Sequence, residues 1–170
     1  LTVLNTAPVN TILPVISGTA AVGGTLSTTD GTWTDADGDV PTYSYQWKAN
    51  GSNVGTDTNS YTLTVSEAHK TITVVVTADD GNGSADQTAT SAGTAVSNSA
   101  PVNTVLPVIS GAVFIDSTLS TTGGTWSDAD GDTPTYSYQW KADGVNITGA
   151  TASSYLLTNA EASTTITVVV

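Results

Sequence analysis

The segment Thr42-Tyr43-Ser44-Tyr45-Gln46-Trp47-Lys48 decides how this 170-residue chain folds. Its aromatic side chains occupy alternate positions, and a period of two places Tyr43, Tyr45 and Trp47 on one face of a β-strand. The same alternation occurs at Tyr61, Leu63 and Val65 and again at Ile72, Val74 and Val76. We expect these three faces to close one apolar core.

Six segments in the first half of the chain are rich in β-branched and aromatic residues and are bounded by Gly, Asn and Asp clusters. They cover residues 12–17, 25–29, 42–48, 60–65, 71–78 and 85–96. Short strands at this spacing, in a chain with few helix formers, predict an all-β fold of the β-sandwich type.

The aromatic segment returns at residues 135–141, so that Trp47 recurs as Trp140, 93 positions along the chain. Trp33 recurs as Trp126 at the same interval, and the second copy carries one inserted residue between Lys141 and Tyr155. A repeat of this length matches a self-sufficient domain rather than one unit of a solenoid. We therefore expect two domains of one kind, at residues 7–99 and 100–170.

Both ends of the sequence fit an array with more than two repeats. Residues 1–4 align with residues 94–97, so we expect residues 1–6 to be the tail of a preceding repeat and its linker. The second repeat contains no counterpart of residues 77–98, so we expect it to be truncated before its last strand.

The composition excludes several classes of function. Three basic and fifteen acidic residues give a net charge of -12, which repels a phosphate backbone, so we expect no binding to nucleic acid. No apolar run approaches the roughly 20 residues of a spanning helix, so we expect no membrane insertion. The chain has no cysteine, so disulfides, thiolate metal sites and cysteine nucleophiles are impossible.

The order of landmarks resembles the immunoglobulin superfamily: a strand from Trp47 to Gly51, then Tyr61-Thr62-Leu63-Thr64, an acidic corner at Glu67-Ala68 and an apolar strand at 72–76. The two cysteines and the corner tyrosine of antibody-type domains are missing. The chain is therefore similar to the bacterial immunoglobulin-like tandem repeats of large surface adhesins, of the RTX or biofilm-associated type, and of phage fibre proteins.

This resemblance implies tandem immunoglobulin-like β-sandwich domains with Greek-key connections. It also implies a secreted or cell-surface (extracellular) location on bacteria. The partners it implies are neighbouring repeats of the same chain and a host surface or glycan.

An acidic loop precedes each tryptophan strand, Asp35-Ala36-Asp37-Gly38-Asp39 in the first copy and Asp128-Ala129-Asp130-Gly131-Asp132 in the second. Three carboxylates on alternate positions of a turn can converge on a hard cation such as calcium (Ca2+), which takes six to eight oxygens. The loop is not an EF-hand, because its twelfth position is Gln46 where a bidentate glutamate is required.

Further calcium ligands must therefore come from other loops. In an immunoglobulin-like sandwich, the turn that begins at Asp79 and Asp80 and the entering linker lie at the same end as the acidic loop. The predicted metal ligands are Asp35, Asp37, Asp39, Asp79, Asp80, Asp128, Asp130 and Asp132. The alternative is that these turns are simply solvated and promote solubility and secretion.

Catalysis is not expected. The single histidine, His69, has Ser163 as its counterpart, so no Ser-His-Asp arrangement recurs in both copies. The acidic residues cluster in a turn rather than facing each other across a cleft. Trp33 and Trp126 allow two interpretations, a stacking platform for a sugar or a place in the core, and we favour the core.

Three functions remain open. The first is a calcium-stabilised structural extender or stalk of an adhesin, which projects a distal binding domain. The second is a carbohydrate- or surface-binding module. The third is a strand-exchanging subunit of an extracellular filament or phage fibre, in which a neighbour's N-terminal segment fills the edge left open in the second repeat.

Overall fold

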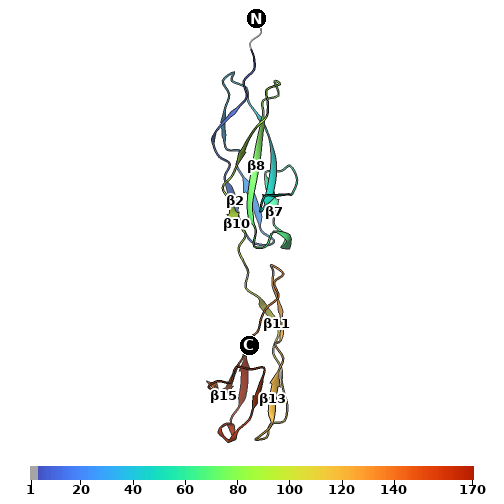
Figure 1. Cartoon of the computed structure of the whole chain (residues 1–170), viewed down its shortest axis with the longest axis vertical. Helices are drawn as coiled ribbons and strands as arrows, with labels where there is room; N and C mark the ends of the chain where they lie inside the picture. The colour runs from blue at the N-terminus through green and yellow to red at the C-terminus, as the bar shows by residue number, and fades with distance from the viewer. Residues whose placement is uncertain (1–3) are drawn as a thin grey trace. The chain divides into compact units, whose positions relative to one another are not determined.

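The structure is a computed structural model that describes residues 4–170. The chain divides into two compact units, Leu1–Ser99 and Ala100–Val170, and the boundary falls where the second copy of the repeat begins (Figure 1). All sheets are antiparallel and small, and the only helices among the described residues are two three-residue 3-10 turns. The all-β prediction is confirmed. No helix of these residues is long and apolar enough to cross a bilayer.

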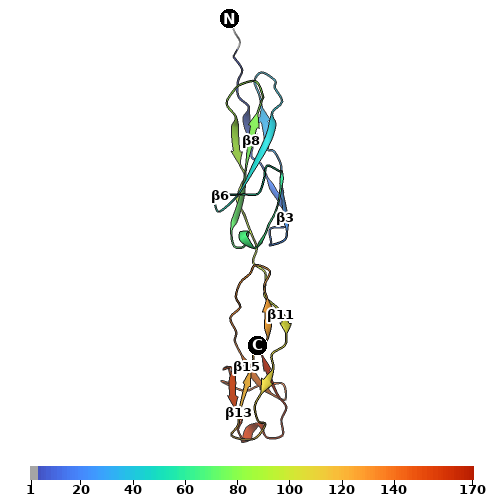
Figure 2. The ribbon, with the colours of Figure 1, turned by 90° about the vertical axis from the view of Figure 1, so that its right-hand side faces the viewer.

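The first unit consists of short strands around one long pair. Its elements are β1 (Val9–Ile12), β2 (Ile16–Gly18), β3 (Thr25–Thr28), β4 (Thr32–Thr34), β5 (Thr42–Ala49), β6 (Ser52–Val54), β7 (Ser60–Thr62), η1 (Val65–Glu67), β8 (Thr71–Asp79), β9 (Gln87–Thr90) and β10 (Thr94–Ala95). The sheets are β1-β4, β2-β3-β7 and β10-β8-β5-β6, with β9 also paired to β8. The long strand β8 runs along the unit in both ribbon views (Figures 1 and 2).

The core of the first unit draws residues from two of these sheets. Leu26 on β3 and Trp47 on β5 belong to one buried cluster, and both are fully buried. Leu63, Ile72, Val74, Val76 and Val96 complete the buried cluster. The predicted core faces at 43–47 and 72–76 are thus confirmed, with the two tyrosines half-buried. Val65 was predicted inside but is 55% exposed, because it begins η1 instead of continuing β7.

Several predicted strand boundaries were wrong for local reasons. The segment predicted at 12–17 is two strands, because Pro14 has no N–H to donate to a ladder. The segment predicted at 85–96 divides into β9 and β10. Strands β4 and β6 were missed because three residues are too few for an alternating pattern to be recognised.

The second unit repeats much of this arrangement with fewer elements. They are β11 (Val102–Val105), β12 (Ile109–Ser110), β13 (Thr118–Thr121), β14 (Thr125–Ser127), β15 (Gln139–Ala142), β16 (Val145–Asn146), β17 (Ser154–Leu156), η2 (Asn159–Glu161) and β18 (Ile166–Val169). The sheets are β11-β14, β12-β13-β17 and β16-β15-β18. Its buried cluster is smaller and contains Leu119, Trp140, Ala150 and Leu157.

One sequence adopts two structures in the two units. Residues 42–48 lie within β5, whereas the identical residues 135–141 become a strand only from Gln139 onward. In the first unit, Tyr43 pairs with Ala78 on β8, and residues 100–170 contain no counterpart of that partner. Tyr136 is consequently 44% exposed. Residues 135–138 lie outside any strand.

Candidate metal centre

The first acidic loop lies between β4 and β5 and gathers three carboxylates. One oxygen each from Asp35, Asp37 and Asp39 lies within 4.8 Å of the others. Calcium binds oxygen at about 2.3–2.6 Å, so two oxygens on opposite sides of the ion are up to about 5 Å apart. The three side chains therefore have the spacing needed to share one calcium ion.

Local turn geometry explains this convergence. The backbone N–H of Asp37 donates to Oδ1 of Asp35 at 2.8 Å, which forms an Asx turn. Gly38 follows with a φ of 84°, a left-handed conformation that glycine adopts without steric cost. The chain thus reverses between the second and third aspartates and returns Asp39 to the other two.

The second oxygen of Asp35 is the feature that most suits a cation. Its Oδ2 is shielded from solvent and has no hydrogen-bond partner within residues 4–170. A shielded carboxylate oxygen without a donor is costly, and a bound cation would satisfy it. The donor chemistry fits calcium, which prefers carboxylate and carbonyl oxygens, and water would have to complete the coordination.

The same loop holds the segment that enters the first unit. The backbone N–H and the hydroxyl of Thr6 both donate to Oδ2 of Asp37, at 2.6 and 2.8 Å. These two bonds hold the pKa of Asp37 below its usual value, against partial desolvation and the negative charge of Asp80. The neighbouring Asn5 donates through Nδ2 to Oδ2 of Asp80 at 2.9 Å. The acidic loop, the turn at Asp80 and the entering segment therefore meet, as the sequence predicted.

Asp79 and Asp80, however, lie outside the group of three. Oδ1 of Asp79 accepts from the N–H of Gly81 at 2.7 Å, and Oδ1 of Asp80 accepts from Asn82 at 2.9 Å. The hydroxyl of Ser84 donates to the other oxygen of Asp80. The bonds from Ser84 and Asn82 lower the pKa of Asp80. Both side chains were predicted as metal ligands, and the structure uses them to build a turn and to hold the entering segment.

The second acidic loop has the same sequence but not the same convergence. Asp128 accepts from the N–H of Asp130 at 2.8 Å, so the first turn is retained. Asp130 is only 4% exposed, and across the described chain no three carboxylates other than those of the first loop meet at cation spacing. The loop leads into the irregular segment 133–138 rather than into a long strand. Asp128, Asp130 and Asp132 are thus not brought together.

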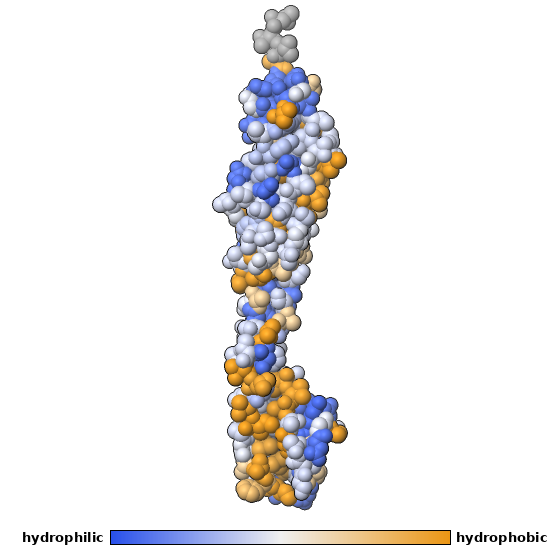
Figure 3. All heavy atoms as spheres, turned by 180° about the vertical axis from the view of Figure 1, so that it is seen from behind, coloured by the Kyte–Doolittle hydropathy of each residue, from blue (hydrophilic) through white to orange (hydrophobic). Residues whose placement is uncertain are grey.

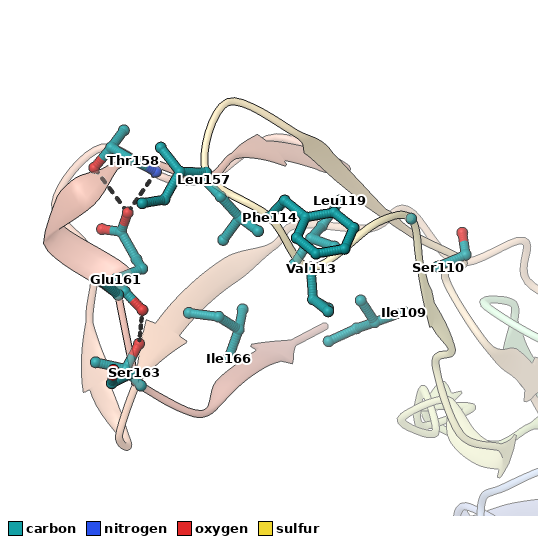
Figure 4. Close-up of a pocket in the computed structure, with 14 residues that line it drawn as sticks. Ile109, Ser110, Val113, Phe114, Leu119, Leu157, Thr158, Glu161, Ser163 and Ile166 are labelled. Atoms are coloured by element: carbon teal, nitrogen blue, oxygen red, sulfur yellow. Dashed lines mark hydrogen bonds between the residues drawn. The ribbon is translucent and has the colours of Figure 1, made fainter.

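The acidic corners have a role that the sequence analysis did not assign. Oε2 of Glu67 accepts from the N–H and the hydroxyl of Thr64, at 2.9 and 2.7 Å, in a capping box around η1. Burial opposes ionisation of Glu67, which is 3% exposed, but these bonds hold its pKa below the usual value. Glu161 does the same for Thr158 at η2. The Thr-x-x-Glu spacing in the sequence could have predicted both capping boxes, the second of which is drawn in Figure 4.

The tryptophans that precede the acidic loops differ in their surroundings, although each donates from its ring nitrogen to a nearby carbonyl. Nε1 of Trp33 donates to the carbonyl of Asp30 at 2.8 Å, and its ring lies 6.3 Å from that of Tyr43. Trp126 donates to the carbonyl of Gly123 at the same distance. Both rings are half-buried. Trp33 packs against the buried cluster of its unit, which supports the core interpretation there. Trp126 lies outside the cluster of the second unit and lines a small pocket with Tyr136 and Val170.

No family model matches the chain, and no curated protein matches it. The internal repeat and the geometry of the acidic loop therefore carry the functional argument.

Proposed function

We propose that the chain is a spacer of a secreted or cell-surface tandem-repeat protein of the adhesin type, stabilised by calcium at Asp35, Asp37 and Asp39. The bound ion would fix the segment that enters the first unit. One observation carries this proposal: Asp37 belongs both to the three-carboxylate group and to the contact that holds Thr6.

A cation would act through the loop rather than through the linker directly. Three carboxylates at this spacing repel one another, and a cation among them offsets that repulsion. Because Thr6 uses only Oδ2 of Asp37, the other oxygen of that carboxylate can still reach an ion. Calcium would then hold the loop in the conformation that accepts both bonds from Thr6.

A spacer requires that the segment entering each repeat has little freedom to bend. Asn5 and Thr6 are held by two separate loops, and Pro8 follows with its φ fixed by the ring. A linker bound at consecutive residues is less free to bend than a solvated one, because its bound conformers are fewer. The contacts of the entering segment therefore favour a stiff spacer over a flexible linker.

The finer fold assignment is part of the proposal. We assign each unit to the immunoglobulin-like β-sandwich class with Greek-key connections. Supporting this, the buried cluster of the first unit joins Leu26 from the β2-β3-β7 sheet to Trp47 and Val74 from the β5-β8 pair. A core made between two antiparallel sheets is the arrangement of a sandwich.

Calorimetric titration with calcium after chelation tests the metal assignment. We expect one ion per chain for the wild type, loss of binding in Asp35→Asn, and retained binding in the matched control Asp128→Asn. The control changes the identical position of the second loop, where the carboxylates do not converge. Absence of heat together with an unchanged melting temperature at millimolar calcium would leave only the solvated-turn interpretation.

A further inference from the structure

Two asparagines of the first unit are followed by glycine, at Asn50-Gly51 and Asn82-Gly83, and the sequence contains no other such pair. An asparagine in this context is chemically labile, because glycine has no side chain to keep its backbone nitrogen away from the preceding side chain. Both asparagines are exposed to solvent, and a Cβ built on either glycine would meet nothing within 4 Å. Access to water and free space therefore do not distinguish the two sites.

The fold holds the first of these side chains in place. Oδ1 of Asn50 accepts from the N–H of Thr71 at 2.9 Å, and the N–H of Asn50 donates to the carbonyl of Thr71 at 2.9 Å. The second unit has Asp143 at this position, with the same two bonds to Thr165, at 2.8 and 2.9 Å. The position thus serves as a fixed oxygen acceptor, and the side chain of Asn50 must break a hydrogen bond before it can turn toward the following nitrogen.

The side chain of Asn82 has no such restraint. It makes no hydrogen bond to any described residue, and the backbone N–H of Asn82 donates to Oδ1 of Asp80 at 2.9 Å. Gly83 follows with a φ of 86° in the irregular turn between β8 and β9. This turn lies beside the entering residue Asn5, and Figure 3 shows mostly hydrophilic residues at the end of the first unit where the chain enters. The side chain of Asn82 is therefore free to turn in water.

We propose that Asn82 is a site of spontaneous deamidation, whereas Asn50 is protected by the fold. The backbone nitrogen of Gly83 attacks Cγ of Asn82 and loses its proton, and the side-chain nitrogen leaves as ammonia, which closes a succinimide ring. Water then opens the ring at one of its two carbonyls. Opening at Cγ gives aspartate, and opening at the backbone carbonyl gives isoaspartate, in which the backbone runs through Cβ and Cγ.

The reaction changes the turn that holds the entering segment. Oδ2 of Asp80 accepts from the hydroxyl of Ser84 and from Nδ2 of Asn5, the latter at 2.9 Å. Isoaspartate lengthens the backbone between Asp80 and Ser84 by one atom and so displaces that hydroxyl from Oδ2. Both products also add a negative charge two residues from Asp80, which repels its carboxylate. Asn5 is then held less firmly. The importance of this loosening for a spacer rests on the proposed function, but the reaction itself does not.

Mass spectrometry of the aged chain tests this selectivity, and each chain carries its own control. Cleavage after the three lysines places Asn50 in peptide 49–70 and Asn82 in peptide 71–141. After incubation of the full chain in warm, mildly alkaline buffer, we expect deamidation at Asn82 to be at least about tenfold faster than at Asn50, the rate effect of about 1.4 kcal/mol of hydrogen bonding. In urea the two rates should converge, because both sites are Asn-Gly. Equal rates in the folded chain, or a ratio that urea leaves unchanged, would overturn the proposal.

Nuclear magnetic resonance of the side-chain amide of Asn5 tests the loosening of the turn. In the aged wild-type chain we expect its resonances to move toward those of a solvated asparagine, in proportion to the deamidated fraction. The matched control is Asn82→Gln, which keeps the backbone N–H and the amide but would have to close a larger ring, so its Asn5 resonances should not change on ageing. Asn5 resonances that stay in place in a deamidated wild-type chain would refute the loosening. All these readouts are made with a chelator and without calcium, so their failure is distinct from a failure of the metal assignment.

Discussion

Replacing Val96 by alanine should destabilise the first unit far more than the length of β10 suggests. The strand has two residues, but the side chain that follows it is 6% exposed and lies in the main core cluster. Removing two methyl groups loses about 1.6 kcal/mol of transfer free energy at roughly 0.8 kcal/mol each. The cavity left behind raises the total to about 2–3 kcal/mol.

Thermal unfolding of the full chain, followed by calorimetry, measures this loss. A loss of 1 kcal/mol lowers the melting temperature of a domain of this size by roughly 4–8 °C, so a loss of about 2–3 kcal/mol should lower the transition of the first unit by about 8–24 °C. Val65→Ala is the matched control, because Val65 is 55% exposed on η1 and its loss should stay within about 0.5 kcal/mol. Equal shifts for the two variants would refute the claim that the segment after β10 closes the core.

Three other perturbations have expected outcomes. Glu67→Gln should lower the free energy of unfolding, measured in urea, by about 1–2 kcal/mol. Glu161→Gln should lower it less, because the carboxylate of Glu67 is buried in its capping box and that of Glu161 is not. The pKa of Asp37 is lowered by its bonds from Thr6, so exchange protection of the Thr6 amide should be constant above the ordinary aspartate pKa of 3.8 and disappear as pH falls through the lower folded value. Burial and the hydrogen bond to Asp30 raise the pKa of Tyr45 to about 12, so ultraviolet titration should find one tyrosine that ionises last. Since the raised pKa stabilises the protonated phenol, stability should decline between about pH 10 and 12. Tyr45→Phe should make this decline smaller without removing it, because the pKa values of Tyr43, Tyr61 and Tyr155 are raised as well.

The central strand could be predicted from the sequence because its pattern coincides with its environment. Tyr43, Tyr45 and Trp47 alternate toward a core that closes on the same face. The identical residues of the second copy show the limit of that reasoning. A strand depends on cross-strand partners, and where the counterpart of Ala78 is missing, Tyr136 lies outside any strand. Periodicity describes what a segment can do, and nonlocal pairing decides whether it does so.

At the candidate site, too, identical sequences have different structures in the two units. Both copies share the turn in which the first aspartate accepts from the N–H two residues later, and this turn was predictable from sequence. Convergence of three carboxylates occurs only in the first loop, which leads directly into the fully paired β5. The bonds from Asn5 and Thr6 were predictable only in their location, since sequence placed the entering segment at that end but could not assign individual donors.

Nuclear magnetic resonance of the full chain during calcium titration tests the central claim most directly. The amides of Asp35, Asp37, Asp39 and Thr6 should shift together with one saturation curve, while those of the loop at Asp128 to Asp132 stay in place. Unchanged Asp35, Asp37 and Asp39 resonances at millimolar calcium, or equal shifts in both loops, would contradict the account.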